Sequence, residues 1–227
     1  MPPVLDRVRA RIPEVRGRAL RPLLRFREMQ FPTFPSEIHE DIAVTDDYFR
    51  YTTLGLAVQR LRDEDVPGAF AEVGVWRGVT CALLHRLAPD RTLHLFDTFE
   101  GFPDRDLPPG TEDTRFRDTS QEAVRARVGA SPNVRLHPGY VPETLSAVEG
   151  ERFAFVLLDL DLYDPTVAAL EFFYQRLEPG GYLVMHDYNN PESDWACKRA
   201  FDGFLADRPE RLVELGDTWG SALIRRA

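Results

Sequence analysis

The sequence predicts an α/β fold in which a mainly parallel sheet carries helices on both faces. Five strand-like runs alternate with five helical segments along the chain, which is the order that crossover-connected parallel strands require. The strand-like runs are largely apolar, as expected for strands that helices cover on both sides. Two short runs near the C-terminus flank the turn 216–220 and predict an antiparallel hairpin at one edge, which brings the sheet to seven strands.

The elements follow one another in a regular order. Thr45-Asp-Asp47 is typical of a helix N-terminus and predicts a helix from Tyr48 to about Arg62. Strands are then expected at 69–75, 92–97, 133–137, 152–159 and 180–186. Helices are expected at 78–88, 119–128, 141–148, 164–177 and 194–206. The hairpin strands are expected at 212–215 and 221–224.

The N-terminal part differs in composition from the rest, so we divide the chain into an arm or lid segment, residues 1–44, and a domain, residues 45–227. Residues 1–28 contain eight arginines and three acidic residues, although the whole chain carries a net charge of −9. Such a segment could be a targeting peptide or a membrane-surface helix. We favour packing on the acidic body of its own or a neighbouring subunit, which predicts a homo-oligomer.

Composition excludes several classes of partner. The net charge of −9 offers phosphate backbones little to bind, so we expect no nucleic-acid partner. No apolar run approaches the roughly 20 residues of a membrane span, and no signal-peptide core follows the N-terminus. Cys81 and Cys197 are the only cysteines, and we expect buried free thiols. These observations predict a cytoplasmic protein without a membrane partner.

The first strand leads into a turn with glycines at positions 74 and 78, and Glu72 precedes the turn. Glycine allows a backbone to approach a ligand closely, and the helix that follows directs its N–H groups at the same place. Asp97 ends the next strand, and this order is typical of a site for a nucleoside-bearing cofactor. The four-residue spacing of Gly74 and Gly78 does not match G-x-G-x-x-G, so it favours S-adenosylmethionine over NAD.

Residues 98–118 form a long segment without a helical or strand-like pattern. It leaves from the carboxyl end of the second strand, where open α/β sheets bind their ligands. Long loops in compact domains are usually functional. We therefore interpret this one as a flap over the cofactor, with a solvated surface loop as the alternative.

A group of acids follows the fourth strand, and a histidine and another acid end the fifth. Asp159 and Asp161 come directly after an apolar run, and His186 and Asp187 follow the next one. The carboxyl ends of adjacent parallel strands meet at one edge of the sheet, so these side chains should converge. Gathered carboxylates need a cation or a proton, and a divalent metal would serve. His186 could be a ligand, an acid–base group or a buried hydrogen-bonding residue, whereas Asp164 is expected only to cap a helix that begins at Pro165.

Five motifs in this order resemble the macrocin O-methyltransferase (TylF-type) family, across roughly residues 45–225. The motifs are Glu72-Val-Gly-Val-Trp-Arg-Gly78, Leu95-Phe-Asp-Thr-Phe-Glu-Gly101, Asp159-Leu-Asp-Leu-Tyr-Asp-Pro-Thr166, Glu178-Pro-Gly-Gly-Tyr182 and His186-Asp-Tyr188. The resemblance implies the class I methyltransferase fold, with the hairpin as its antiparallel edge, and makes residues 45–227 an S-adenosylmethionine-dependent methyltransferase domain. It further implies an enzyme that O-methylates a hydroxyl of a sugar or polyol on a natural product such as an antibiotic.

The same resemblance implies roles for individual residues. The cofactor would be bound by Glu72, Gly74, Val75, Trp76, Gly78, Asp97, Thr98, Phe99, Gly139 and Tyr140. A divalent cation, usually magnesium, would be bound by Asp159, His186 and Asp187. The chain departs from the family pattern at His186, where the better-studied members carry an acid. An imidazole ligand would favour softer ions than magnesium, for example manganese, or Asp159 and Asp187 would act alone.

The predicted reaction needs a hydroxyl made more anionic and aligned with the donated methyl group. A metal that binds two vicinal oxygens would lower the pKa of that hydroxyl, and we assign the base to Asp159, with Asp161 in reserve. A metal-dependent methyltransferase acting on a catechol or another small molecule is the first alternative. A nicotinamide oxidoreductase and a non-catalytic cofactor-binding protein are the others.

Overall fold

The computed structural model describes residues 31, 33–107, 110 and 113–227. The arginine-rich stretch of the predicted arm lies outside these residues. The chain divides into two compact units, residues 1–39 and 40–227, and the fold described below is that of the second.

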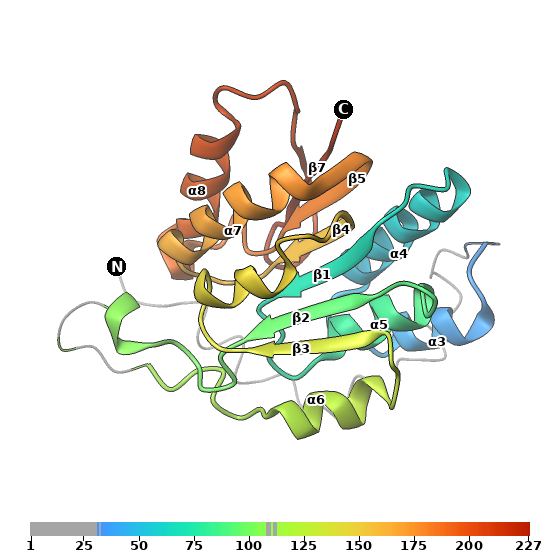
Figure 1. Ribbon diagram of the computed structural model, residues 1–227, viewed down its shortest axis with the longest axis horizontal. Helices are drawn as coiled ribbons and strands as arrows, with labels where there is room; N and C mark the ends of the chain where they lie inside the picture. The colour runs from blue at the N-terminus through green and yellow to red at the C-terminus, as the bar shows by residue number, and fades with distance from the viewer. Residues whose placement is uncertain (1–30, 32, 108–109, 111–112) are drawn as a thin grey trace. The chain divides into compact units, whose positions relative to one another are not determined.

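The second unit is built on one seven-stranded sheet (Figure 1). Its strands stand in the order β3-β2-β1-β4-β5-β7-β6. The first five are parallel, and β7 runs antiparallel to both β5 and β6. The strands are β1 (Ala69–Val73), β2 (Leu93–Asp97), β3 (Val134–Pro138), β4 (Phe153–Leu158), β5 (Leu177–Met185), β6 (Val213–Glu214) and β7 (Ala222–Arg225). The predicted mainly parallel sheet with an antiparallel hairpin edge is confirmed.

Helices cover both faces of this sheet (Figure 1). Buried side chains divide into two clusters, because successive strand residues point to opposite faces. One cluster contains residues of α7 (Tyr163–Arg176) and α8 (Ala196–Leu205), and the other contains residues of α4 (Tyr48–Asp63), α5 (Val79–Leu87) and α6 (Gln121–Val128). The central strands β1 and β4 are buried along their whole length. A short helix α3 (Ser36–Ala43) precedes α4.

Three elements differ from the sequence-based expectation. Residues Glu143–Val148 form a 3₁₀ helix, η2, directly after Pro142. Strand β5 begins at Leu177 and not at the expected residue 180, so that it includes Glu178-Pro-Gly-Gly181. Helix α7 begins at Tyr163 with Leu162 as its N-cap, so Asp164 lies inside the first turn and is not the cap that was predicted. A carboxylate in that turn still interacts favourably with the helix dipole.

The strand ends that carry the predicted site are joined by backbone hydrogen bonds. The N–H of Asp159 donates to the carbonyl of Val73 over 2.8 Å, and the N–H of His186 donates to that of Leu158 over 2.9 Å. Gly74 allows the close approach of β1 and β4, since a Cβ at this position would lie 1.9 Å from the carbonyl oxygen of Asp159. The glycine of the predicted ligand turn thus also packs against the strand that bears the acids.

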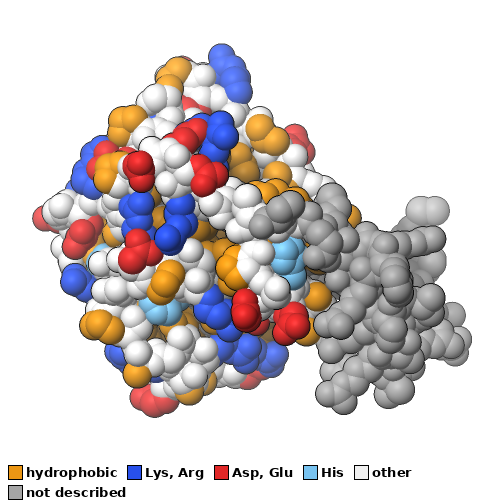
Figure 2. Space-filling view, turned by 90° about the vertical axis from the view of Figure 1, so that its right-hand side faces the viewer, with side chains coloured by type: hydrophobic (Ala, Val, Ile, Leu, Met, Phe, Trp, Pro, Cys, Tyr) orange, Lys and Arg blue, Asp and Glu red, His pale blue; other side chains and the backbone are white. Residues whose placement is uncertain are grey.

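The described residues contain no helix that is both long and apolar enough to cross a membrane. Acidic, basic and apolar side chains are interspersed on the face shown in Figure 2. Cys81 and Cys197 are buried free thiols, as expected. Two further short 3₁₀ helices, η1 (Asp104–Asp106) and η3 (Pro191–Ser193), lie in the loops after β2 and β5.

Candidate active site

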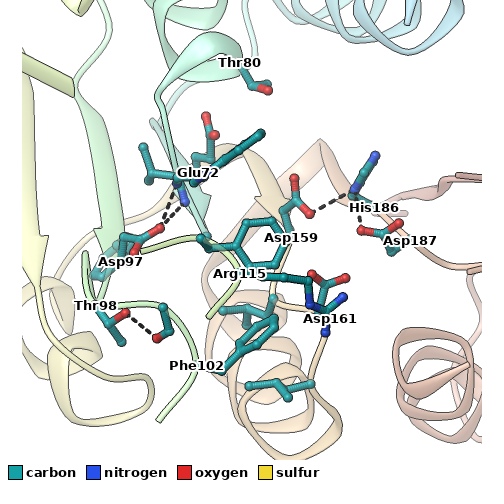
Figure 3. Close-up of a pocket in the computed structure, with 18 of the residues that line it drawn as sticks. Glu72, Thr80, Asp97, Thr98, Phe102, Arg115, Asp159, Asp161, His186 and Asp187 are labelled. Atoms are coloured by element: carbon teal, nitrogen blue, oxygen red, sulfur yellow. Dashed lines mark hydrogen bonds and ion pairs between the residues drawn. The ribbon is translucent and has the colours of Figure 1, made fainter. Parts of the chain in front are cut away.

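A cavity of about 470 Å³ opens at the carboxyl ends of β1, β2, β4 and β5 (Figure 3). This volume lies within the range of sites for cofactors and other small molecules. Its wall contains the glycine turn and Asp97 on one side and Asp159, Asp161, His186 and Asp187 on the other. The two groups of residues that the sequence singled out therefore face one space.

Asp97 organises the glycine turn. Its Oδ2 accepts hydrogen bonds from the backbone N–H groups of Val75 and Trp76, over 2.7 and 2.8 Å, and its Oδ1 accepts one from Phe99 over 2.7 Å. Trp76 and Phe99 have positive φ angles of 48° and 58°, which non-glycine residues rarely adopt. The carboxylate of Asp97 thus holds strained backbone on both sides of it, and a carboxylate retains lone pairs for a further donor.

Glu72 is buried at the end of β1, on the wall of the cavity. Its Oε2 has no hydrogen-bond partner among the described residues. Burial raises the pKa of Glu72 well above its ordinary value, and the nearby Arg50 only partly offsets this effect. A buried carboxyl oxygen without a partner indicates that a donor from a ligand belongs there.

The other predicted cofactor residues fall into two groups. Thr98, Gly139 and Tyr140 line the cavity together with Gly74, Val75 and Trp76. Gly78 and Phe99 do not: Gly78 is the N-cap of α5, and Phe99 packs against the apolar cluster below. These two residues therefore support the glycine turn and the end of β2 without lining the cavity.

The long loop after β2 lies over the cavity, as the flap interpretation requires. Phe102, Arg115 and Phe116 line the cavity from this loop. The ring of Phe116 packs edge-on against the rings of both Trp76 and Phe102. Asp118, at the end of the loop, accepts a hydrogen bond from the indole N–H of Trp76 over 2.8 Å. The loop is therefore tied to the glycine turn.

The predicted acids converge around the imidazole of His186. Its Nδ1 lies 2.9 Å from Oδ1 of Asp159 and 2.8 Å from Oδ2 of Asp187. The side-chain amide of Asn190 donates to the other oxygen of Asp187 over 3.0 Å. Nε2 of His186 is buried and has no hydrogen-bond partner among the described residues. The imidazole thus bridges the ends of β4 and β5.

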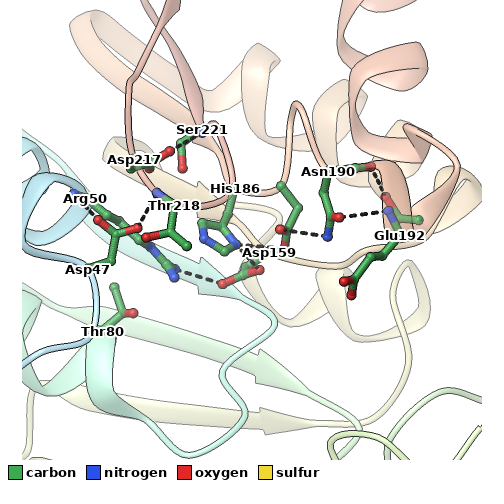
Figure 4. A network of polar contacts seen from close by, with 12 residues as sticks. Asp47, Arg50, Thr80, Asp159, His186, Asn190, Glu192, Asp217, Thr218 and Ser221 are labelled. Carbon is green, nitrogen blue, oxygen red and sulfur yellow. Dashed lines mark hydrogen bonds and ion pairs between the residues drawn. The ribbon is translucent and has the colours of Figure 1, made fainter. Parts of the chain in front are cut away.

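Arg50 enters this cluster from α4, and the sequence analysis missed it (Figure 4). Its guanidinium donates to Oδ2 of Asp159 over 2.8 Å, and its side chain is 11% exposed. Asp47, the N-cap of α4, accepts hydrogen bonds from the backbone N–H of Arg50 and of Thr218. The start of α4 is thereby fixed to the loop between β6 and β7.

Burial and the neighbouring charges shift the pKa values of three side chains in this cluster. Burial alone would raise the pKa of Asp159, but His186 and Arg50 hold it well below its ordinary value. Burial opposes protonation of His186, but Asp159 raises its pKa to about 10. Burial, reinforced by Asp187 and Asp159, raises the pKa of Asp161 well above its ordinary value. Asp161 is therefore the carboxyl of this group that holds a proton most readily.

The Macrocin-O-methyltransferase (TylF) family model matches residues 47–212. The chain belongs to this family. It is accordingly an S-adenosylmethionine-dependent O-methyltransferase, and the nicotinamide oxidoreductase and the non-catalytic protein considered above are not supported.

Three relatives illustrate the similarity. The mycinamicin III 3''-O-methyltransferase of Micromonospora griseorubida is 31% identical over 186 residues, which cover 74% of this chain and 70% of that protein. The demethyldecarbamoylnovobiocin O-methyltransferase of Streptomyces niveus is 28% identical over 201 residues, which cover 80% of this chain and 74% of that protein. The structure of the O-methyltransferase NovP superposes with a TM-score of 0.68 and 27% identity, covering 79% of this chain and 80% of that one.

Proposed function

We propose that this methyltransferase transfers a methyl group from S-adenosylmethionine to a hydroxyl of a sugar or polyol carried by a natural product. The observation that carries the proposal is the shared cavity: the glycine turn with Asp97 and Glu72 forms one wall, and the acidic cluster forms the facing wall. The names of the relatives support the acceptor class, because these proteins O-methylate mycinamicin III, demethyldecarbamoylnovobiocin and a rhamnosyl derivative of tetracenomycin C.

The residues of the first wall fit the cofactor. Glu72 offers a buried carboxyl oxygen without a partner, which suits a cationic or N–H donor. Asp97 sits at the end of β2 beside the glycine turn and can accept further hydrogen bonds from ribose hydroxyls. When bound, S-adenosylmethionine supplies a methyl group made electrophilic by its sulfonium.

For the general base, the contacts favour Asp161. Asp159 accepts hydrogen bonds from Arg50 and His186, and these two groups hold its pKa well below its ordinary value, so this carboxylate is a weak base. Asp161 lines the cavity one step further along the same strand end. In the proposed step the acceptor oxygen bonds to the methyl carbon as the carbon–sulfur bond breaks, and the hydroxyl proton passes to Asp161. Alignment of the hydroxyl with the methyl group in the cavity supplies the rest of the acceleration.

The divalent cation predicted from the sequence does not fit this arrangement. A ligand atom from each of Asp159, His186 and Asp187 lies within 4.8 Å of the other two. However, Nδ1 of His186 faces a carboxylate on each side, and carboxylates only accept hydrogen bonds, so this nitrogen carries a hydrogen. The lone pair of the neutral imidazole would lie on Nε2, across the ring from both carboxylates, so the three side chains do not direct lone pairs at one point. The second oxygen of Asp159 is held by Arg50. The proposed reaction therefore has no step through a metal.

A panel of acceptors tests the function. The purified chain is incubated with S-adenosylmethionine and either glycosylated macrolides and aminocoumarins or catechols, and products are identified by mass spectrometry. We expect methylation of the glycosylated compounds only. Methylation confined to catechols would refute the sugar acceptor and support the alternative small-molecule methyltransferase.

The base assignment is tested with two isosteric variants. Asp161→Asn should lower turnover by about 10²–10⁴-fold, the usual contribution of a general base, with the affinity for S-adenosylmethionine retained. Asp159→Asn should lower turnover through loss of the Arg50 and His186 contacts, and it should also lower the midpoint of thermal unfolding. An Asp161→Asn variant with normal turnover would remove this residue from the mechanism.

A further inference from the structure

We propose that Arg50 supplies the positive charge of the acidic cluster in place of a divalent cation, so that this chain needs no metal for methyl transfer. The inference concerns the acidic wall of the cavity and rests on the proposed function of that cavity. It makes Arg50 a positioning residue, which acts through Asp159.

Arg50 is placed as an internal cation. Its side chain is 11% exposed, and its guanidinium contacts Asp159 at 2.8 Å from the first turn of α4. Guanidinium remains charged at every pH at which proteins are stable, so this charge is permanent. Nε of Arg50 is buried without a hydrogen-bond partner among the described residues, so the head group makes its polar contact through the atom that faces Asp159.

The position of Arg50 is held from outside the cluster. Asp47 accepts the N–H of Arg50 over 3.0 Å and that of Thr218 over 2.7 Å, so the first turn of α4 is linked to the loop between β6 and β7 (Figure 4). Asp47 is itself 7% exposed. Since Asp47 is buried and accepts both N–H groups, and the Arg50 side chain is itself only 11% exposed, the guanidinium is pre-positioned and does not have to be drawn in from solvent.

The contacts of Arg50 leave little room for a second cation. Carboxylates gathered at one place require a compensating charge, and the partly buried Asp159 receives one from Arg50 and a hydrogen from His186. A dication bound between Asp159 and Asp187 would lie beside the guanidinium and would be repelled by it. It would also have to displace the hydrogen that His186 places between the two carboxylates. The charge and the hydrogen-bond geometry both indicate a site completed by side chains.

Manganese binding tests this inference without an acceptor or a methyl donor. The chain is treated with a chelator, and the electron paramagnetic resonance signal of free Mn²⁺ is followed on titration of the unmodified chain and of Asp187→Asn, Arg50→Met and Arg60→Met. Arg60→Met is the matched control, because Arg60 lies on the same helix but its side chain is 59% exposed. Calorimetric titration with Mg²⁺ repeats the comparison.

We expect the unmodified chain to bind no more Mn²⁺ than Asp187→Asn does, and Arg60→Met to behave in the same way. Arg50→Met should bind Mn²⁺ with an affinity at least about tenfold higher than that of the unmodified chain, because the repelling charge is gone. One Mn²⁺ on the unmodified chain that is lost in Asp187→Asn would overturn the proposal, as would a folded Arg50→Met that gains no site. The unmodified chain decides the matter even if Arg50→Met does not fold. Because no turnover is measured, failure here leaves the proposed methyl transfer intact, and failure to methylate any acceptor leaves this result intact.

Discussion

Gly74 lies in the glycine turn of one cavity wall and packs against the backbone of Asp159 in the other wall. The substitution Gly74→Ala tests how much this close packing contributes to the free energy of unfolding. A Cβ at this position would lie 1.9 Å from the carbonyl oxygen of Asp159, which belongs to the backbone and cannot rotate away. Gly74 also has a φ angle of +88°. A left-handed conformation costs a non-glycine residue about 1–2 kcal/mol, and overpacking adds about 1–3 kcal/mol. Gly74→Ala should therefore lower the free energy of unfolding by about 2–5 kcal/mol.

Gly129 provides a control with almost the same φ angle, and its ψ angle of 167° places it in a region that is essentially restricted to glycine. Its φ angle is +89°, but no atom lies within 4 Å of the Cβ that alanine would add. Urea unfolding of both variants separates the two contributions, since Gly129→Ala should show a conformational cost of about 1–3 kcal/mol without overpacking. Calorimetric titration should also show weaker binding of S-adenosylmethionine to Gly74→Ala and unchanged binding to Gly129→Ala. Equal destabilisation by the two substitutions would show that the contact with Asp159 relaxes without cost and would refute this reasoning.

Three further predictions concern single polar residues. Asp97→Asn places an amide N–H₂ against backbone N–H groups, so calorimetry should show cofactor affinity reduced by about tenfold or more, equivalent to about 1.4 kcal/mol. Asp47→Ala removes the cap of α4 and leaves the N–H of Thr218 without its acceptor; urea unfolding should show a loss of about 0.5–2 kcal/mol, of which Asp47→Ser recovers most. Burial, aided by neighbouring positive groups, lowers the pKa of His94 from 6.5 to about 4. Between these values only the unfolded chain binds the proton, so stability should fall by up to about 3 kcal/mol as pH drops from 6.5 to 4, and His94→Phe should flatten that dependence.

The fold could be predicted because its strands are buried on both faces and its helices separate them. Runs such as 153–158 contain only apolar residues, and the parallel order follows from the alternation with helices. The start of β5 was placed too late because proline and glycine occur both in turns and in irregular parts of strands. Glu178-Pro-Gly-Gly181 has the composition of a turn but lies within β5 as an irregularity: the pairing with β4 passes from Leu177 directly to Tyr182, and Gly180 and Gly181 are hydrogen-bonded to the backbone of Arg226.

The convergence of the acids was also predictable, whereas their hydrogen bonds were not. Parallel strands place their carboxyl ends along one edge, so Asp159 and His186 had to be neighbours. Whether Nδ1 of His186 meets a metal or two carboxylates depends on side-chain rotation, which spacing along the chain does not reveal. In the same way, the motif around Asp97 indicates a cofactor site, but its contacts with Val75 and Trp76 depend on the left-handed backbone of the turn.

Arg50 was missed although the sequence contained a signal for it. The buried face of α4 includes Leu54, Ala57, Val58 and Leu61. Arg50 lies four residues before Leu54 and seven before Ala57, so it continues the same apolar stripe toward the N-terminus of the helix. A charged residue at such a position must either reach solvent or meet an opposite charge inside the protein. Since the helix begins beside the carboxyl edge of the sheet, where the acids gather, the second outcome was the one to expect. A basic residue on the buried apolar face of any helix that begins beside the carboxyl edge of a sheet can be identified in the same way as an internal cation. Here this reasoning identifies Arg50 as the counter-charge of Asp159 without a metal.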